Sequence, residues 1–170
     1  ERLAAGGIKV ATLTNGSNLK GKVADAFASH GTWVRVSVDG WSDDSYAEAR
    51  SVRIGAFTQL LKNMEAFSKL KSPCELGVSF IVTHANNSHI YEALEKFKIA
   101  GVGHVKVSGA VVANSVTENN AYHSKICDVV AEQVAKAKGL EDDHFRVVNH
   151  YHELEERFEK TYDYCPFLLF

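Results

Sequence analysis

Short apolar, β-branched segments alternate along the chain with longer segments whose apolar residues recur every three or four positions. Runs rich in valine, isoleucine, phenylalanine and threonine predict strands, and largely apolar runs predict strands buried on both faces. A period near 3.6 predicts helices with one buried face. The predicted strands are 9–14, 33–38, 76–83, 104–112 and 145–149, and the predicted helices are 19–30, 43–50, 57–70, 88–100, 117–138 and 152–160.

This alternation of strands and helices predicts an α/β fold. Parallel strands need long crossover connections, which are usually helical and right-handed. The 170 residues are enough for one domain with a sizeable core. No proline- or glycine-rich linker divides the sequence, so we expect a single α/β domain with parallel strands.

Composition narrows the classes of function. The 19 basic and 21 acidic residues give a formal net charge of -2, which argues against a nucleic-acid or membrane-surface partner. No apolar run approaches the roughly 18 residues that would span a bilayer. Three cysteines far apart form no disulfide framework, and they favour a reducing, cytoplasmic compartment.

Small and polar residues follow every predicted strand. In parallel α/β folds, functional groups gather at the carboxyl ends of the strands. Such a rim could hydrogen-bond a polar ligand, but the same residue types are the usual helix caps, and Gly16 and Gly40 could simply form turns. Both interpretations stay open from these residues alone. The clusters are 14–18, 37–40, 83–88, 113–115 and 149–152.

Histidine, cysteine and arginine offer weaker candidates. His150 and His152 would share one side of a continuing strand, which makes them a possible metal pair, although structural or surface histidines are more common. Cys74 and Cys127 are expected to be small buried apolar residues. Arg50 ends a short acidic helix, where a basic side chain usually complements the helix dipole.

Five short phrases occur at the predicted strand ends and in the helices between them. They are ATLTNGS at 11–17, WVRVSVDG at 33–40, SYAEAR at 45–50, LLKN at 60–63 and LGVSFIVT at 76–83. Each phrase is weak alone, whereas their order and spacing are more specific. Together they resemble the radical S-adenosylmethionine superfamily, and the resemblance covers almost the whole chain.

The resemblance implies a partial (β/α) TIM-like barrel, with parallel strands inside, helices outside and the first two strands lacking. The barrel segment would occupy residues 1–160. S-adenosylmethionine would lie across the carboxyl ends of the strands. Since a barrel without its first strands leaves a strand edge unpaired, we expect another chain or a missing domain to cover that edge.

Carried over residue by residue, the resemblance implies roles in cofactor binding. Ser37 would hydrogen-bond the ribose or methionine part, and Arg50 would pair with the carboxylate through a charge-assisted contact. Asn15 and Asp39 would line the site or order its loops, and residues 108–111 would flank the adenine. The implied cofactor-binding residues are Asn15, Gly16, Ser37, Asp39, Arg50 and Ser108.

The cluster ligands of the family are missing from this sequence. The family's CxxxCxxC motif supplies three thiolates to a [4Fe–4S] cluster, and Cys74, Cys127 and Cys165 do not have that spacing. We therefore expect the ligands upstream of Glu1, in a longer parent enzyme, and expect this chain alone to be inactive. Residues 161–170 resemble the start of a SPASM or twitch extension, with Cys165 as a ligand of an auxiliary cluster.

Three functional hypotheses follow. The first is a segment of a radical S-adenosylmethionine enzyme, whose cluster cleaves the cofactor reductively to a 5′-deoxyadenosyl radical that abstracts hydrogen from a small-molecule or peptide substrate. The second is a non-catalytic α/β module that binds a nucleoside or S-adenosylmethionine. The third is a metal-dependent barrel hydrolase that uses His150 and His152.

Overall fold

A single parallel sheet forms the centre of the molecule. The structure, a computed structural model, describes residues 1–151. The five strands pair in the order β1-β2-β3-β4-β5, so that each strand lies beside its neighbour in sequence. They are β1 (Val10–Thr14), β2 (Gly31–Ser37), β3 (Glu75–Val82), β4 (His104–Gly109) and β5 (Arg146–Asn149).

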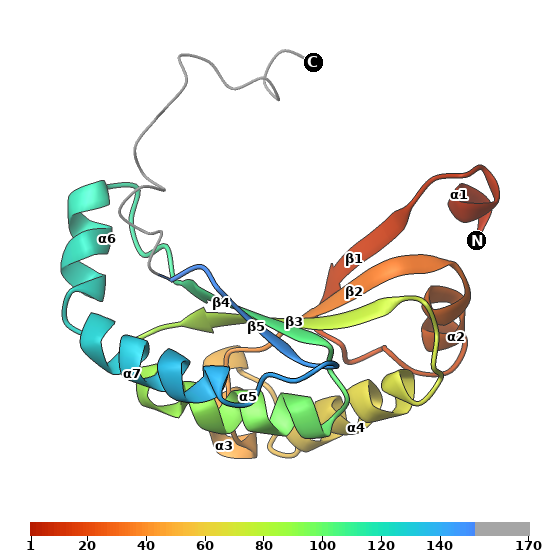
Figure 1. The fold of residues 1–170 in the computed structure, drawn as a ribbon. Coiled ribbons are helices and arrows are strands. Elements are labelled where there is room, and N and C mark those ends of the chain that lie inside the picture. Colours follow the sequence, from red (N-terminus) through yellow and green to blue (C-terminus); the bar gives the residue numbers. More distant parts are fainter. Residues whose placement is uncertain (152–170) are drawn as a thin grey trace, which may run out of the picture.

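Helices connect the strands and cover one side of this sheet. The sheet is curved, and α3, α4, α5 and α7 lie on its convex side, below the strands in Figure 1. All five predicted strands and the α/β fold are confirmed. The helices are α1 (Arg2–Ala5), α2 (Gly21–His30), α3 (Asp43–Arg50), α4 (Ala56–Ser68), α5 (Ile90–Ile99), α6 (Val116–His123) and α7 (Cys127–Lys138), with a 3-10 turn η1 (Asn87–His89).

The core lies between the convex, outer face of the sheet and these helices. Side chains alternate between the two faces of a strand, and the outward positions are the apolar ones. Phe80 of β3 packs there against Phe97 of α5, with ring centroids 6.4 Å apart. The fully buried outer-face residues are Val34, Val36, Val78, Phe80, Val82, Val105 and Val107.

The opposite, concave face of the sheet, here called the inner face, is polar. Its positions on β2 hold Trp33, Arg35 and Ser37, which are half-buried, whereas their neighbours Val34 and Val36 are fully buried. The prediction of strands buried on both faces is therefore wrong for residues 1–151. Polar residues on β2 and β4 interrupt this face, so its apolar residues Leu13 and Ile81 remain partly exposed within residues 1–151.

Two predicted elements differ from the structure after β4. The predicted strand 104–112 ends at Gly109, and the predicted helix 117–138 is broken between α6 and α7. The buried Asn119 explains the break, because its amide accepts from Val112 N at 2.8 Å and donates to Ala113 O at 2.6 Å. These bonds fasten α6 to the preceding loop, so α6 does not continue the line of α7.

The two cysteines within residues 1–151 have different environments. Cys74 is buried, as expected. Cys127 is exposed, so the expectation of a buried residue is wrong there. Ile126 and Val130 take the inward positions of the first turn of α7, which leaves Cys127 on the solvent side.

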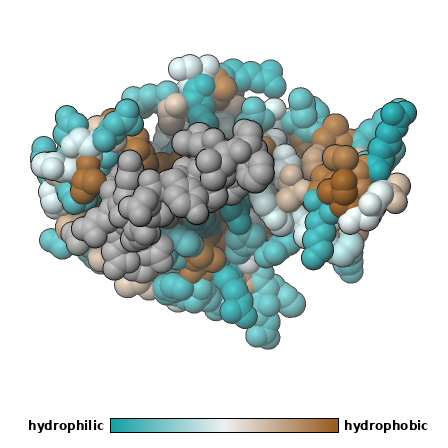
Figure 2. All heavy atoms as spheres, turned by 90° about the horizontal axis from the view of Figure 1, so that it is seen from above, coloured by the Kyte–Doolittle hydropathy of each residue, from teal (hydrophilic) through white to brown (hydrophobic). Residues whose placement is uncertain are grey.

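The sheet does not close within residues 1–151. β1 pairs only with β2, and β5 only with β4. Large apolar side chains are exposed near the free edge of β1, and Figure 2 shows a brown surface over α1 and β1. Two expectations stay predictions: that the barrel lacks its first two strands, and that another chain or domain covers the free edge of β1. The exposed residues are Leu3, Ile8 and Leu13.

None of the helices within residues 1–151 combines the length and the apolar character needed to cross a membrane.

We predict that two adjacent substitutions in β3 have different effects on stability. Phe80→Ala removes a fully buried ring from the outer face and should lower the free energy of unfolding by about 3–5 kcal/mol. Ile81→Ala, on the 38% exposed inner-face neighbour, should cost about 1 kcal/mol or less. Urea denaturation followed by circular dichroism measures both. Equal losses would contradict the assignment of the two faces.

Candidate functional site

The loop after β1 is held by hydrogen bonds between its own residues and by hydrogen bonds from α4. Asn15 Oδ1 accepts hydrogen bonds from Ser17 N at 3.1 Å and from Ser17 Oγ at 2.8 Å. Asn63, which is buried, donates through Nδ2 to Gly16 O at 3.0 Å and to Ser17 O at 3.1 Å. Asn15 therefore shapes the loop locally, and Asn63 fixes the loop to α4.

Gly16 is required at the centre of this loop. Its φ is +72°, in the left-handed region that favours glycine. A Cβ atom there would also collide with the side chains of Leu60 and Val36. The backbone of the loop thus lies directly on the core, and the residue implied in cofactor binding has a structural role of its own.

Hydroxyl groups line the inner face near the carboxyl ends of the strands. Ser37 of β2 pairs in register with Ser79 of β3, and Ser108 of β4 pairs with Ile81. Within residues 1–151, none of these three serine side chains makes a hydrogen bond. Neighbouring strands lie about 4.8 Å apart, so Ser37 and Ser79 lie side by side, and Ser108 lies farther toward the carboxyl end because its partner is Ile81. Together they form a diagonal row of hydroxyls that is available to a polar ligand.

An ion pair joins the end of β2 to the end of α3. Arg50 Nη2 lies 2.5 Å from Asp39 Oδ2, and the two side chains are 34% and 22% exposed. Asp39 also accepts a hydrogen bond from Ile81 N at 3.4 Å. Asp39 therefore orients Arg50 at the carboxyl ends of the strands.

The ion pair also affects the nearby Tyr46. Burial raises the pKa of the Tyr46 phenol, Arg50 lowers it, and the Asp39 carboxylate raises it.

Asn86 connects the ends of β2 and β3. Its side chain is 2% exposed and donates through Nδ2 to Asp39 O and to Ile81 O, both at 2.9 Å. Its Oδ1 accepts from Thr83 N at 2.7 Å. All the hydrogen bonds of this amide go to backbone groups at the strand ends, so Asn86 fixes the position of Asp39.

The start of α3 sets the direction of the helix that carries Arg50. Ser42 and Ser45 form a reciprocal cap, in which Ser42 Oγ accepts from Ser45 N at 3.1 Å and Ser45 Oγ accepts from Ser42 N at 2.9 Å. Gly40 permits the close approach of the helix, because a Cβ there would lie 2.7 Å from Tyr46 Cα. The polar cluster after β2 thus both caps a helix and presents Asp39.

Asp43 ties the start of α3 to the start of α4. Its carboxylate accepts from Thr58 N at 2.9 Å and from Thr58 Oγ1 at 2.6 Å. These hydrogen bonds lower the pKa of the Asp43 carboxyl. The contact links the helix of Arg50 to the helix of Asn63, which are the two helices that order the rim.

A cavity of about 630 Å³ opens beside the rim. Asn15, Tyr46 and Asn63 are among its lining residues, together with the exposed Arg53. It lies between the loop after β1 and the helices α3 and α4. Among the described residues, its lining does not include Arg50, Ser37 or Ser108, so the cavity is separate from the ion pair and the hydroxyls.

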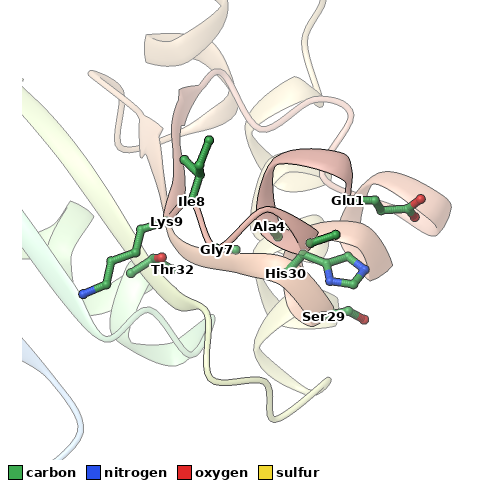
Figure 3. A pocket seen from close by; sticks show the side chains of 10 residues that line it. Glu1, Ala4, Gly7, Ile8, Lys9, Ser29, His30 and Thr32 are labelled. Atoms are coloured by element: carbon green, nitrogen blue, oxygen red, sulfur yellow. The ribbon is translucent and has the colours of Figure 1, made fainter.

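A second cavity, of about 430 Å³, lies at the opposite end of the strands. Glu1, Ser29 and His30 line it, beside the amino ends of β1 and β2. In Figure 3, Lys9 extends to the opposite side of the strand from His30. This cavity contains none of the residues that the resemblance implies in cofactor binding.

The predicted metal sites have little support within the described part of the chain. His150 directly follows β5, whereas His152 and Cys165 lie outside the described residues. Among residues 1–151, no three side chains of histidine, cysteine, aspartate or glutamate form a group that could hold a metal ion. The anchoring roles of Asn63 and Asn86 are not predictable from the sequence, because each side chain bonds to a backbone group 47 residues away.

Comparison with known proteins finds a likeness in fold. No family model and no curated protein matches the chain. Three crystal structures of SuiB from Streptococcus suis match it with TM-scores of 0.60 to 0.62 at 12% sequence identity. One is bound to S-adenosylmethionine and another to the precursor peptide SuiA. The matches cover 97% of this chain but only 38–39% of SuiB, so the chain spans about two-fifths of that protein.

We predict that Asn86→Ala destabilises the protein more than a matched exposed change. The substitution leaves buried backbone groups at the strand ends without partners, and should lower the free energy of unfolding by about 1–3 kcal/mol. Asn18→Ala is the control, because Asn18 is exposed and its side chain makes no hydrogen bond within residues 1–151. Urea denaturation compares the two. Equal effects would contradict the anchoring role of Asn86.

The Asp43 contact predicts a pH dependence of stability. Because folding lowers the pKa of this carboxyl, its contribution is fully present above the unfolded pKa of about 4 and is lost as the pH falls through the lower folded value. Asp43→Asn should remove that part of the acid dependence. Thermal denaturation of both proteins between about pH 5 and pH 2 measures it. Parallel pH profiles would contradict the prediction.

Proposed function

We propose that this chain is the cofactor-binding part of a radical S-adenosylmethionine enzyme, and that it binds S-adenosylmethionine at the carboxyl ends of β1 to β4. The observation that carries the proposal is the oriented Asp39–Arg50 pair beside the unpartnered Ser37 hydroxyl. The likeness in fold to SuiB, which has been crystallised with S-adenosylmethionine, supports it. So does the resemblance of the strand-end phrases to that superfamily.

Arg50 would hold the carboxylate of the cofactor. A guanidinium carries several N–H donors, and the contact with Asp39 is made through Nη2. The side chain is one-third exposed, so the remaining donors can reach a ligand. A carboxylate of the cofactor could bind the remaining donors, while the contact with Asp39 limits the positions that the guanidinium can take.

Ser37 and the loop after β1 would bind the neutral parts of the cofactor. The Ser37 hydroxyl can both donate to and accept from a ribose or amine group. Asn15 and Gly16 give the neighbouring loop a fixed shape, and Ser108 completes the row of hydroxyls farther along the sheet. S-adenosylmethionine would therefore span β1 to β4 without rearrangement of the backbone.

The residues of this part of the chain do not fit an iron–sulfur cluster. Cys74 is buried, Cys127 is exposed, and within residues 1–151 neither belongs to a group of ligands. A cluster of the parent enzyme would supply the electron that cleaves S-adenosylmethionine. The role of this chain in that reaction would be to bind and orient the cofactor.

The substrate class that we propose is a peptide. One of the matching SuiB structures contains the precursor peptide SuiA. Inner-face side chains of β2 are only half-buried within residues 1–151 and lie beside the proposed cofactor position, so this face could receive an extended chain.

Binding of S-adenosylmethionine without chemistry is the second candidate, because it uses the same residues and needs no cluster. Anaerobic reconstitution of a full-length parent with iron and sulfide, followed by a 5′-deoxyadenosine assay, separates the two functions. Production of 5′-deoxyadenosine supports the enzyme, and cofactor binding without it supports the module.

Isothermal titration calorimetry of the 170-residue chain with S-adenosylmethionine tests the binding site. Arg50→Gln should weaken binding about tenfold or more, because it removes a charge-assisted contact, and Ser37→Ala should weaken it by less. Arg2→Gln removes an equal charge from an exposed residue of α1, far from the proposed site in the fold, and should bind as the unmodified chain does.

Two results of the titration would overturn the proposed site. One is no heat of binding from a chain that circular dichroism shows to be folded. The other is equal affinity of the Arg50→Gln and Arg2→Gln variants.

A further inference from the structure

A row of basic side chains crosses the inner face below the proposed cofactor position. The strand register places Arg35 of β2 beside Gly77 of β3, and Gly77 beside His104 of β4. Lys106 lies two residues farther along β4, opposite Ser79. Alternation along the strands puts these side chains on the same face as Ser37.

Gly77 creates the space in which the row meets. A Cβ atom at this position would collide with the imidazole of His104. The imidazole therefore lies over the backbone of β3, and its Nε2 is 3.5 Å from Arg35 Nη2. A glycine in the middle of a strand usually marks such a close approach.

The only carboxylate in this row contacts the histidine. His104 Nδ1 lies 2.7 Å from Glu75 Oε1, so this nitrogen carries the ring hydrogen and donates a hydrogen bond to the carboxylate. Nε2 is then free to accept from Arg35. Within residues 1–151, neither Arg35 nor Lys106 forms an ion pair with any carboxylate.

Arg35 has an unsatisfied donor. Its Nε is buried and has no hydrogen-bond partner within residues 1–151. The guanidinium carbon lies 5.1 Å from the centre of the Trp33 ring, so the indole on one side and His104 on the other hold the group in place. A buried donor without a partner is unfavourable and rare, and it indicates a missing acceptor.

We propose that Arg35 and Lys106 bind a carboxylate of the substrate, namely that of an acidic residue in a peptide. The inference rests on the proposed function and adds to it the chemical class and the orientation of the substrate. The planar carboxylate would accept from Arg35, and Lys106 would supply a second positive charge. Trp33 would cover the aliphatic part of the acidic side chain.

This position also orients the substrate with respect to the cofactor. Arg35 and Ser37 are two residues apart on β2, which corresponds to about 7 Å along the strand. A substrate anchored by its carboxylate at Arg35 would extend toward the row of hydroxyls and the proposed S-adenosylmethionine. The part of the peptide adjacent to its acidic residue would then lie nearest the cofactor.

Nuclear magnetic resonance of the arginine Nε–H groups in the ¹⁵N-labelled 170-residue chain tests the inference. The probes are the peptide Ac-Ala-Glu-Ala-NH₂, its glutamine counterpart and inorganic phosphate, at equal ionic strength. The Arg35 Nε–H signal, assigned by its loss in Arg35→Gln, should shift saturably with the glutamate peptide and should not shift with the glutamine peptide. Inorganic phosphate should cause a smaller, non-saturating change.

Lys106→Gln should weaken binding of the glutamate peptide about fivefold or more, because a charge-assisted contact is lost. Lys22→Gln removes an exposed charge from α2 and should leave the affinity unchanged. Equal shifts with the glutamate and glutamine peptides, preferential binding of phosphate, or unchanged affinity of Lys106→Gln would each overturn the proposal.

Titration of S-adenosylmethionine into the same samples separates this inference from the proposed function. Lys106→Gln should bind S-adenosylmethionine as the unmodified chain does. Cofactor binding without peptide binding would reject only the carboxylate site. Peptide binding without cofactor binding would leave the carboxylate site in place and reject the proposed cofactor site.

Discussion

Apolar side chains on the outer face of the sheet, packed against α4, α5 and α7, hold this molecule together. Val36, Val78, Phe80 and Val107 are all inaccessible to solvent on that face. Because one face of each strand supplies the core, the other face is released from packing and can be polar. The basic row, the serine hydroxyls and the open concave surface all follow from this division of the strands.

Three buried asparagines adapt the loops to this sheet. Asn63, Asn86 and Asn119 lie in or next to helices, and each bonds to backbone groups of a loop at the carboxyl ends of the strands. A side-chain amide both donates and accepts hydrogen bonds. It can therefore pair with backbone groups of the loops, where the hydrogen bonds between strands end. The loops at the carboxyl ends of the strands are therefore held by hydrogen bonds from the helix side, and their outward-facing groups remain available to ligands.

The strands and most helices could be predicted because their apolar periods are set locally by the packing of one face. The break between α6 and α7 could not, since it depends on Asn119 bonding to a loop that the pattern assigned to a strand. Similarly, the family resemblance implied Asp39 and Arg50 as cofactor-binding residues but did not reveal their contact with each other. The contact of Arg35 with His104 joins residues that are 69 positions apart in sequence, so no local pattern predicts it.

The order of the strands also bears on how the chain reaches its fold. Each strand pairs with the strand before it, so no segment has to wait for a distant one or to thread between strands already in place. A chain emerging from the ribosome can add one strand and one helix at a time to an existing edge. Each parallel pairing still has to close a helical crossover, so the sheet forms more slowly than a purely helical chain folds.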